Sequence, residues 1–84
     1  MADLIIGLLK EIERDSSIQV DGEYYKPHPL TTAVIYLANE HLADNYDNIH
    51  LLKNNGYNVF AGEQDRFGWL TGCIQLKKGI IVFG

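Results

Sequence analysis

The hydrophobic pattern of this 84-residue chain changes its period near residue 56, and no other feature constrains the fold as strongly. Before that point, apolar residues in three segments recur at three- and four-residue steps, as they do along one face of an α-helix. After it, short runs rich in β-branched and aromatic residues alternate with turn residues, which is typical of strands. The sequence therefore predicts an α+β fold, in which three helices pack on a small antiparallel sheet with a C-terminal β-meander.

Three segments carry the helical pattern. The first has the clearest apolar face, and Asp3 is expected to cap its start. The third stops at Asn55-Gly56, a pair suited to a left-handed C-terminal cap. The predicted helices cover residues 3–15, residues from Thr31 or Thr32 to Ala43, and residues 47–55.

A small hairpin is predicted between the first two helices, over residues 17–26. Asp21-Gly22 is expected to be its two-residue turn, because this pair accepts the positive φ angles that a type I′ turn requires. An isolated hairpin is only marginally stable in water. We therefore expect it to join a larger sheet or to lie on the helices.

The last third of the chain is predicted to form strands at Tyr57–Phe60, Trp69–Leu76 and Ile80–Phe83. A polar loop over residues 61–68 separates the first two. The unbroken apolar run of the last strand suggests burial on both faces, with half-burial at an edge as the alternative. Ile74 in the second of these strands and Leu37 in the second helix are predicted to lie in the core.

The distribution of charge along the sequence argues against a nucleic-acid-binding surface. Eleven acidic and seven basic residues give a formal net charge of −4, and only Lys77 and Lys78 are adjacent cations. Affinity for nucleic acids comes mainly from Lys and Arg that neutralise phosphates. A fold can still bring distant cations together, so nucleic-acid binding is less expected but stays open as an alternative.

Length and cysteine content favour one reduced domain spanning residues 1–84. A chain of this size buries about 63% of its unfolded surface, which is enough for one small core. Cys73 is the only cysteine, so no intrachain disulfide forms, whereas small secreted domains usually carry several. We therefore expect a cytoplasmic protein, without a transmembrane helix and without a secretory signal.

No arrangement of residues in the sequence indicates catalysis, a metal site or a cofactor. His28, His41 and His50 lack the i, i+4 spacing of a helical metal site. Cys73 is predicted to lie in the middle of a strand, where a small apolar filler is the commoner role than a nucleophile. We therefore expect a protein that is not an enzyme and holds no cofactor or metal.

Two surfaces combine aromatic and polar residues in the manner of protein interfaces. The alternative for both is structural, because large aromatic residues also cover the ends of small cores. The first surface is the loop, and the second is the hairpin with the segment that follows it. The interaction residues predicted from these two surfaces are Tyr24, Tyr25, His28, Glu63, Asp65, Arg66, Phe67 and Trp69.

The favoured hypothesis is a small regulatory or protein-interaction module that binds another protein or a second copy of itself, with the C-terminal strand as one possible dimer edge. The alternative is DNA binding, because the predicted order of elements resembles that of winged-helix domains. That resemblance implies a recognition helix at 47–55 and a wing at 61–68. The residues that it would offer to DNA are Asn48, His50, Lys53, Asn54 and Arg66.

Overall fold

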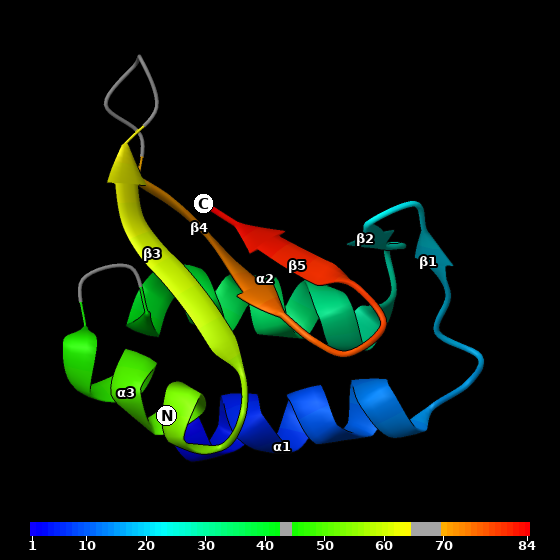
Figure 1. Cartoon of the computed structure of the whole chain (residues 1–84), viewed down its shortest axis with the longest axis horizontal. Coiled ribbons are helices and arrows are strands. Elements are labelled where there is room, and N and C mark those ends of the chain that lie inside the picture. The colour runs from blue at the N-terminus through cyan, green and yellow to red at the C-terminus, as the bar shows by residue number, and fades with distance from the viewer. Residues whose placement is uncertain (43–44, 65–69) are drawn as a thin grey trace.

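The computed structural model describes residues 1–42, 45–64 and 70–84, and within them it contains three helices and a five-stranded mixed sheet. This arrangement confirms the predicted α+β class (Figure 1). No helix among these residues is both long and apolar enough to cross a membrane. In chain order the elements are α1 (Ala2–Arg14), β1 (Val20–Asp21), β2 (Tyr24–Tyr25), α2 (Pro29–His41), α3 (Tyr46–Asn54), β3 (Asn58–Gln64), β4 (Leu70–Gln75) and β5 (Ile80–Phe83).

The strands lie in the order β1-β2-β5-β4-β3. β3, β4 and β5 form the expected antiparallel meander. β2 is antiparallel to β1 but parallel to β5, and it reaches β5 through a single residue pair, Tyr24 and Ile80. The sheet is therefore mixed, whereas the sequence had predicted an antiparallel one.

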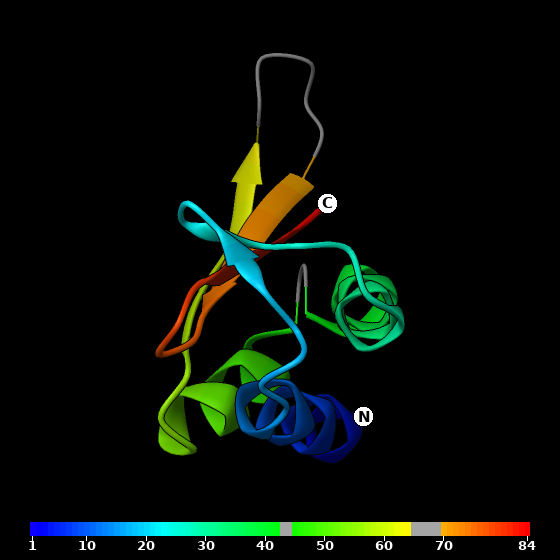
Figure 2. The same ribbon diagram turned by 90° about the vertical axis from the view of Figure 1, so that its right-hand side faces the viewer.

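The helices lie on one side of the sheet, and the core fills the space between the two layers (Figure 2). α1 contributes the longest apolar stripe, as its periodicity predicts. The buried hydrophobic residues are Ala2, Ile5, Ile6, Leu9, Ile12, Ile18, Val34, Ala38, Leu42, Ile49, Leu52, Tyr57, Val59, Ile74, Ile81 and Phe83.

The starts of α1 and α2 differ from the prediction. α1 begins at Ala2, so Asp3 lies in its first turn and does not cap the helix. α2 begins at Pro29, because His28 caps it: the His28 Nδ1 atom accepts the Leu30 N–H at 3.0 Å. In return the Thr31 hydroxyl oxygen accepts the His28 N–H at 2.9 Å. Proline suits the first helical position because its missing N–H would have no helical partner there.

The hairpin turn lies one residue later than predicted. Asp21 pairs with Tyr24, so Gly22 and Glu23 are the two central residues. Gly22 has φ +65°, and no described residue other than glycine has a positive φ. A positive φ at the first central residue alone is the requirement of a type II′ turn, and glycine there meets it without steric cost.

β3 extends through residues 61–64, which had been predicted as the start of a loop. The register changes between Phe60, which pairs with Cys73, and Glu63, which pairs with Thr71. Three steps along β3 therefore match two along β4, which is a β-bulge with one extra residue. Because the bulge takes up the extra residue, the Gly-containing polar segment 61–64 still pairs with β4. Residues 65–69 of the predicted loop lie outside the described residues.

β5 is buried on one face only. Ile81 and Phe83 are 2% exposed, whereas Val82 between them is 49% exposed. The expectation of burial on both faces is therefore wrong. The strand is interior to the sheet, but helices cover only one side, so alternate residues of an apolar run remain at the surface (Figure 2).

Candidate functional site: a groove between β5 and α2

The edge of β5 that faces β2 is only partly occupied. β2 pairs with β5 at Tyr24 and Ile80 alone, and after Tyr25 the chain leaves the sheet toward α2 (Figure 1). Among the described residues, no strand lies beside the remainder of that edge. β5 is thus an interior strand at one end and a free edge at the other.

The backbone groups of β5 alternate in direction because its pairing with β4 is antiparallel. The Leu76 N–H donates to the Gly79 carbonyl at 2.8 Å, so this pair is hydrogen-bonded across the turn. Every second pair from there is also hydrogen-bonded, namely Ile74 with Ile81 and Gly72 with Phe83. The N–H and C=O groups of Ile81 and Phe83 therefore bond to β4.

The intervening residues direct their backbone groups away from β4. The Ile80 N–H accordingly donates to the Glu23 carbonyl at 2.8 Å. Val82 is the next residue whose backbone groups point away from β4. The pairing of β2 with β5 ends at Tyr24 and Ile80, so Val82 has no strand partner on that side among the described residues. Its N–H and C=O therefore face outward at a half-exposed position.

A groove of about 390 Å³ lies beside this free edge, with α2 as its other wall. Its size falls within the range of ligand pockets, and its walls are mainly apolar. Burial, and then the nearby Glu13 carboxylate, raise the pKa of Tyr25 above its ordinary value. The residues that line the groove are Tyr24, Tyr25, Pro27, Thr31, Thr32, Ile35, Ile80, Ile81 and Val82.

The structure brings together only part of the predicted interaction set. Tyr24 and Tyr25 both line the groove, whereas His28 uses its ring nitrogen to cap α2. Sequence reasoning missed Thr32 and Ile35, because nothing local indicates that this end of α2 meets the edge of β5. The unbroken apolar run of β5 could have indicated the groove. Only one face of the strand is buried, so the apolar Val82 is left half-exposed beside the groove.

The loop, the first of the two predicted surfaces, is not assembled by the described residues. Glu63 belongs to β3 rather than to a loop. The other predicted residues of that surface, Asp65, Arg66, Phe67 and Trp69, lie outside the part of the chain that the structure describes. That surface remains a prediction.

The residues predicted to contact DNA are placed on α3, apart from Arg66, which lies outside the described residues. The Asn48 side-chain amide donates to the His41 carbonyl at 2.9 Å and so links α3 to α2. His50, Lys53 and Asn54 are exposed. α3 therefore presents a single cation, which is weak electrostatic support for contact with phosphates.

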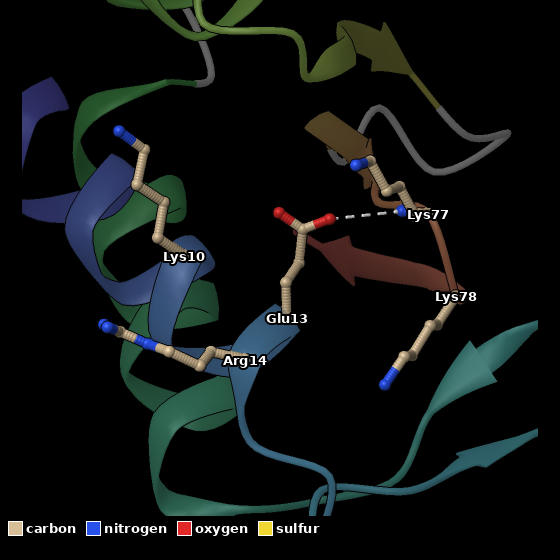
Figure 3. Close-up of a pocket in the computed structure, with 5 residues that line it drawn as sticks. All are labelled: Lys10, Glu13, Arg14, Lys77 and Lys78. Carbon is tan, nitrogen blue, oxygen red and sulfur yellow. Dashed lines mark hydrogen bonds between the residues drawn. The ribbon is translucent and has the colours of Figure 1, made fainter.

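Four cations gather instead around a second hollow, of about 400 Å³, between α1 and the β4–β5 turn (Figure 3). Glu13 stands in its middle, and the ends of Lys10, Arg14 and Lys78 point in different directions. Arg14 also pairs with Glu11. The cations do not converge on one point and a carboxylate lies among them, so we place no anionic ligand there.

The Glu13 side chain links α1 to the sheet. Its carboxylate accepts the Tyr57 hydroxyl at 2.9 Å and the Lys77 backbone N–H at 3.4 Å, and so joins α1 to the start of β3 and to the β4–β5 turn. Burial, and then the bond to this carboxylate, raise the pKa of Tyr57 to about 12 from an ordinary value of 10.0.

Alkaline pH is expected to destabilise the fold through Tyr57. Below pH 10 the phenol is protonated in both states and adds no pH dependence. Above it, the unfolded chain loses the proton first, so stability falls by roughly 1.4 kcal/mol per pH unit until the folded phenol ionises near pH 12. Urea unfolding at pH 9 and pH 11 is the measurement, and Tyr57→Phe should lose less stability over this range. Equal losses in the two proteins would contradict the assignment.

Among the described residues, no three His, Cys, Asp or Glu side chains come together in a group that could hold a metal ion. Cys73 is half-buried on the sheet. Comparison of the chain with protein-family models, with curated proteins and with solved structures finds no match. The groove and the free edge of β5 are therefore the features on which a functional argument rests.

Proposed function

We propose that this chain is a small non-enzymatic interaction module that captures an extended segment of another protein in the groove between β5 and α2. The segment would add to the sheet as a strand along the free edge of β5. The observation that carries the proposal is Val82, whose backbone N–H and C=O face an apolar groove without a strand partner among the described residues.

An extended peptide suits this groove better than a compact ligand. A backbone supplies both a donor and an acceptor at the spacing of a strand, which is what an unpaired strand edge lacks. Side chains at alternate peptide positions would then enter the groove, where Thr32 and Ile35 of α2 form the wall. Main-chain bonds of this kind give affinity, and the side-chain pockets give selectivity.

The chemistry of the groove also limits what binds. None of its lining residues carries a formal charge, so phosphates would find no cation there. The free edge is short, from Ile81 to Phe83, and each hydrogen bond contributes roughly 0.5–1.5 kcal/mol. We therefore expect micromolar rather than nanomolar affinity, with apolar and β-branched residues at alternate positions of the peptide.

A phage-displayed library of random decapeptides tests the proposal. Peptides that the native protein enriches should bind Thr32→Trp at least tenfold more weakly, because the new ring fills the groove. Leu4→Trp is the matched control, since Leu4 is 52% exposed on α1 and lines no part of the groove. In the free protein the Val82 amide should exchange with solvent much faster than the Ile81 and Phe83 amides, and an enriched peptide should slow it.

The outcomes separate the hypotheses. Failure to enrich any peptide, or equal binding by native protein and Thr32→Trp, would remove the groove as the docking site. Retention of the protein on heterogeneous duplex DNA at low salt, weakening as salt rises, would instead favour the DNA-binding alternative.

A further inference from the structure

The face of the sheet opposite the helices has no element packed on it among the described residues (Figure 2). Alternation places two cross-strand rows on this side, because their neighbours Val59, Ile74 and Ile81 are buried in the core. We call these eight residues the open face. The rows are Phe60–Cys73–Val82 and Asn58–Gln75–Ile80–Tyr24–Asp21.

The open face is apolar along its centre, and its charged residue, Asp21, lies at the outer end of the second row, on β1. Phe60 is 53% exposed, Val82 49% and Tyr24 52%, and the half-buried Cys73 lies between the first two. The free side of a sheet that has one face on the core is commonly polar. An uncovered apolar patch with charges excluded from its centre is instead typical of the core of a protein interface.

We propose that the open face is an interface between two copies of this chain, packed sheet against sheet. The area is consistent with a dimer of modest affinity. The three long strands, β3 to β5, are about 13–23 Å long and the two-residue strands β1 and β2 about 7 Å; at a spacing of about 4.8 Å they give a face of roughly 340 Å² in projection and more as accessible surface. Stable interfaces bury about 600–1,000 Å² per partner, so the face and its rim reach the lower end of that range.

The row at the centre of the face is complementary to itself. A two-fold axis along β4 would place Phe60 of one copy against Val82 of the other, with the small Cys73 side chains facing each other. A large residue then meets a smaller one on both sides of the axis. Asp21 lies on the outermost strand, so two chains of net charge −4 would meet at the uncharged central row without like charges in direct contact there.

Sedimentation equilibrium across the micromolar to millimolar range tests the proposal. We expect a concentration-dependent dimer that dissociates at about 10–100 μM. Cys73 is the only thiol of the chain and lies at the centre of the face, so its rate of reaction with a maleimide should fall in proportion to the dimer fraction. Val82→Lys and Phe60→Lys should each weaken the dimer at least tenfold while the circular dichroism of the fold is retained.

Tyr36→Lys is the control, because Tyr36 is 63% exposed on α2, away from this face. It should dimerise as the native protein does. A monomer at all concentrations, a dimer in which Cys73 reacts as fast as in the monomer, or a dimer that survives Val82→Lys would each overturn the proposal. The peptide test depends on Thr32 and this one on Cys73, so the two proposals can fail independently.

Discussion

Ile74→Ala is expected to lower the free energy of unfolding by roughly 2–5 kcal/mol. Ile74 is 0% exposed in the middle of β4, and its neighbours across the sheet are Val59 on one side and Ile81 on the other. The shortened side chain would leave a cavity where β3, β4 and β5 meet the helices. A domain of this length has a total stability of roughly 4–13 kcal/mol, so the loss is a large fraction of it.

Urea and thermal unfolding measure the effect, and Leu37→Ala is the comparison. The sequence predicts both residues in the core, but Leu37 is only partly buried against it, so its truncation should have a clearly smaller effect. A shift in melting temperature of roughly 10–30 °C is expected for Ile74→Ala. Equal losses for the two variants would mean that the packing of β4 on the helices is misassigned.

The helices and the meander were predictable because their signals repeat along the chain. In α1 the apolar stripe recurs over several turns, so an error of one residue at Asp3 does not change which face is buried. The C-terminal end of α3 was equally clear, since Gly56 has φ +91° and follows Asn55 as expected. Each of these features depends on residues close in sequence.

The groove was not predictable for the opposite reason. β2 joins β5 through one residue pair, Tyr24 and Ile80, which are far apart in the sequence and form no pattern with each other. The wall formed by Thr32 and Ile35 exists only because α2 packs beside β5. Tyr24 and Tyr25 were found because aromatic residues with polar tips favour interfaces wherever they occur.

The bulge in β3 was missed because its residues are individually poor strand formers. Glycine and acidic residues are depleted in strands, and they suggested a loop at residues 61–64. β3 is the edge strand of the sheet, however, and an edge tolerates both polar residues and bulges. The pairing that holds the bulge in place depends on Gly72 of the neighbouring strand, which leads to the second large expected effect.

Gly72→Ala is expected to destabilise the fold by about 2–3 kcal/mol through overpacking. A Cβ atom at this position would lie 2.5 Å from the Phe60 carbonyl oxygen and 2.5 Å from the Phe83 Cζ atom. The carbonyl belongs to the backbone of β3 where the bulge begins, so it cannot move away without disturbing the β3–β4 pairing. The Phe83 ring is 2% exposed and packed in the core. Both neighbours therefore resist displacement.

A double-mutant cycle with Phe83→Leu separates the two clashes. Leucine removes the part of the ring that approaches Gly72, so the cost of Gly72→Ala should be smaller in the Phe83→Leu background than in the native one. A residual loss in that background is expected, since the Phe60 carbonyl stays where it was. Chemical denaturation of the four proteins gives the coupling directly. If Gly72→Ala were as stable as the native chain, the close approach of β3 and Phe83 over this glycine would be wrong, and with it the bulge that sets the register of the edge strand.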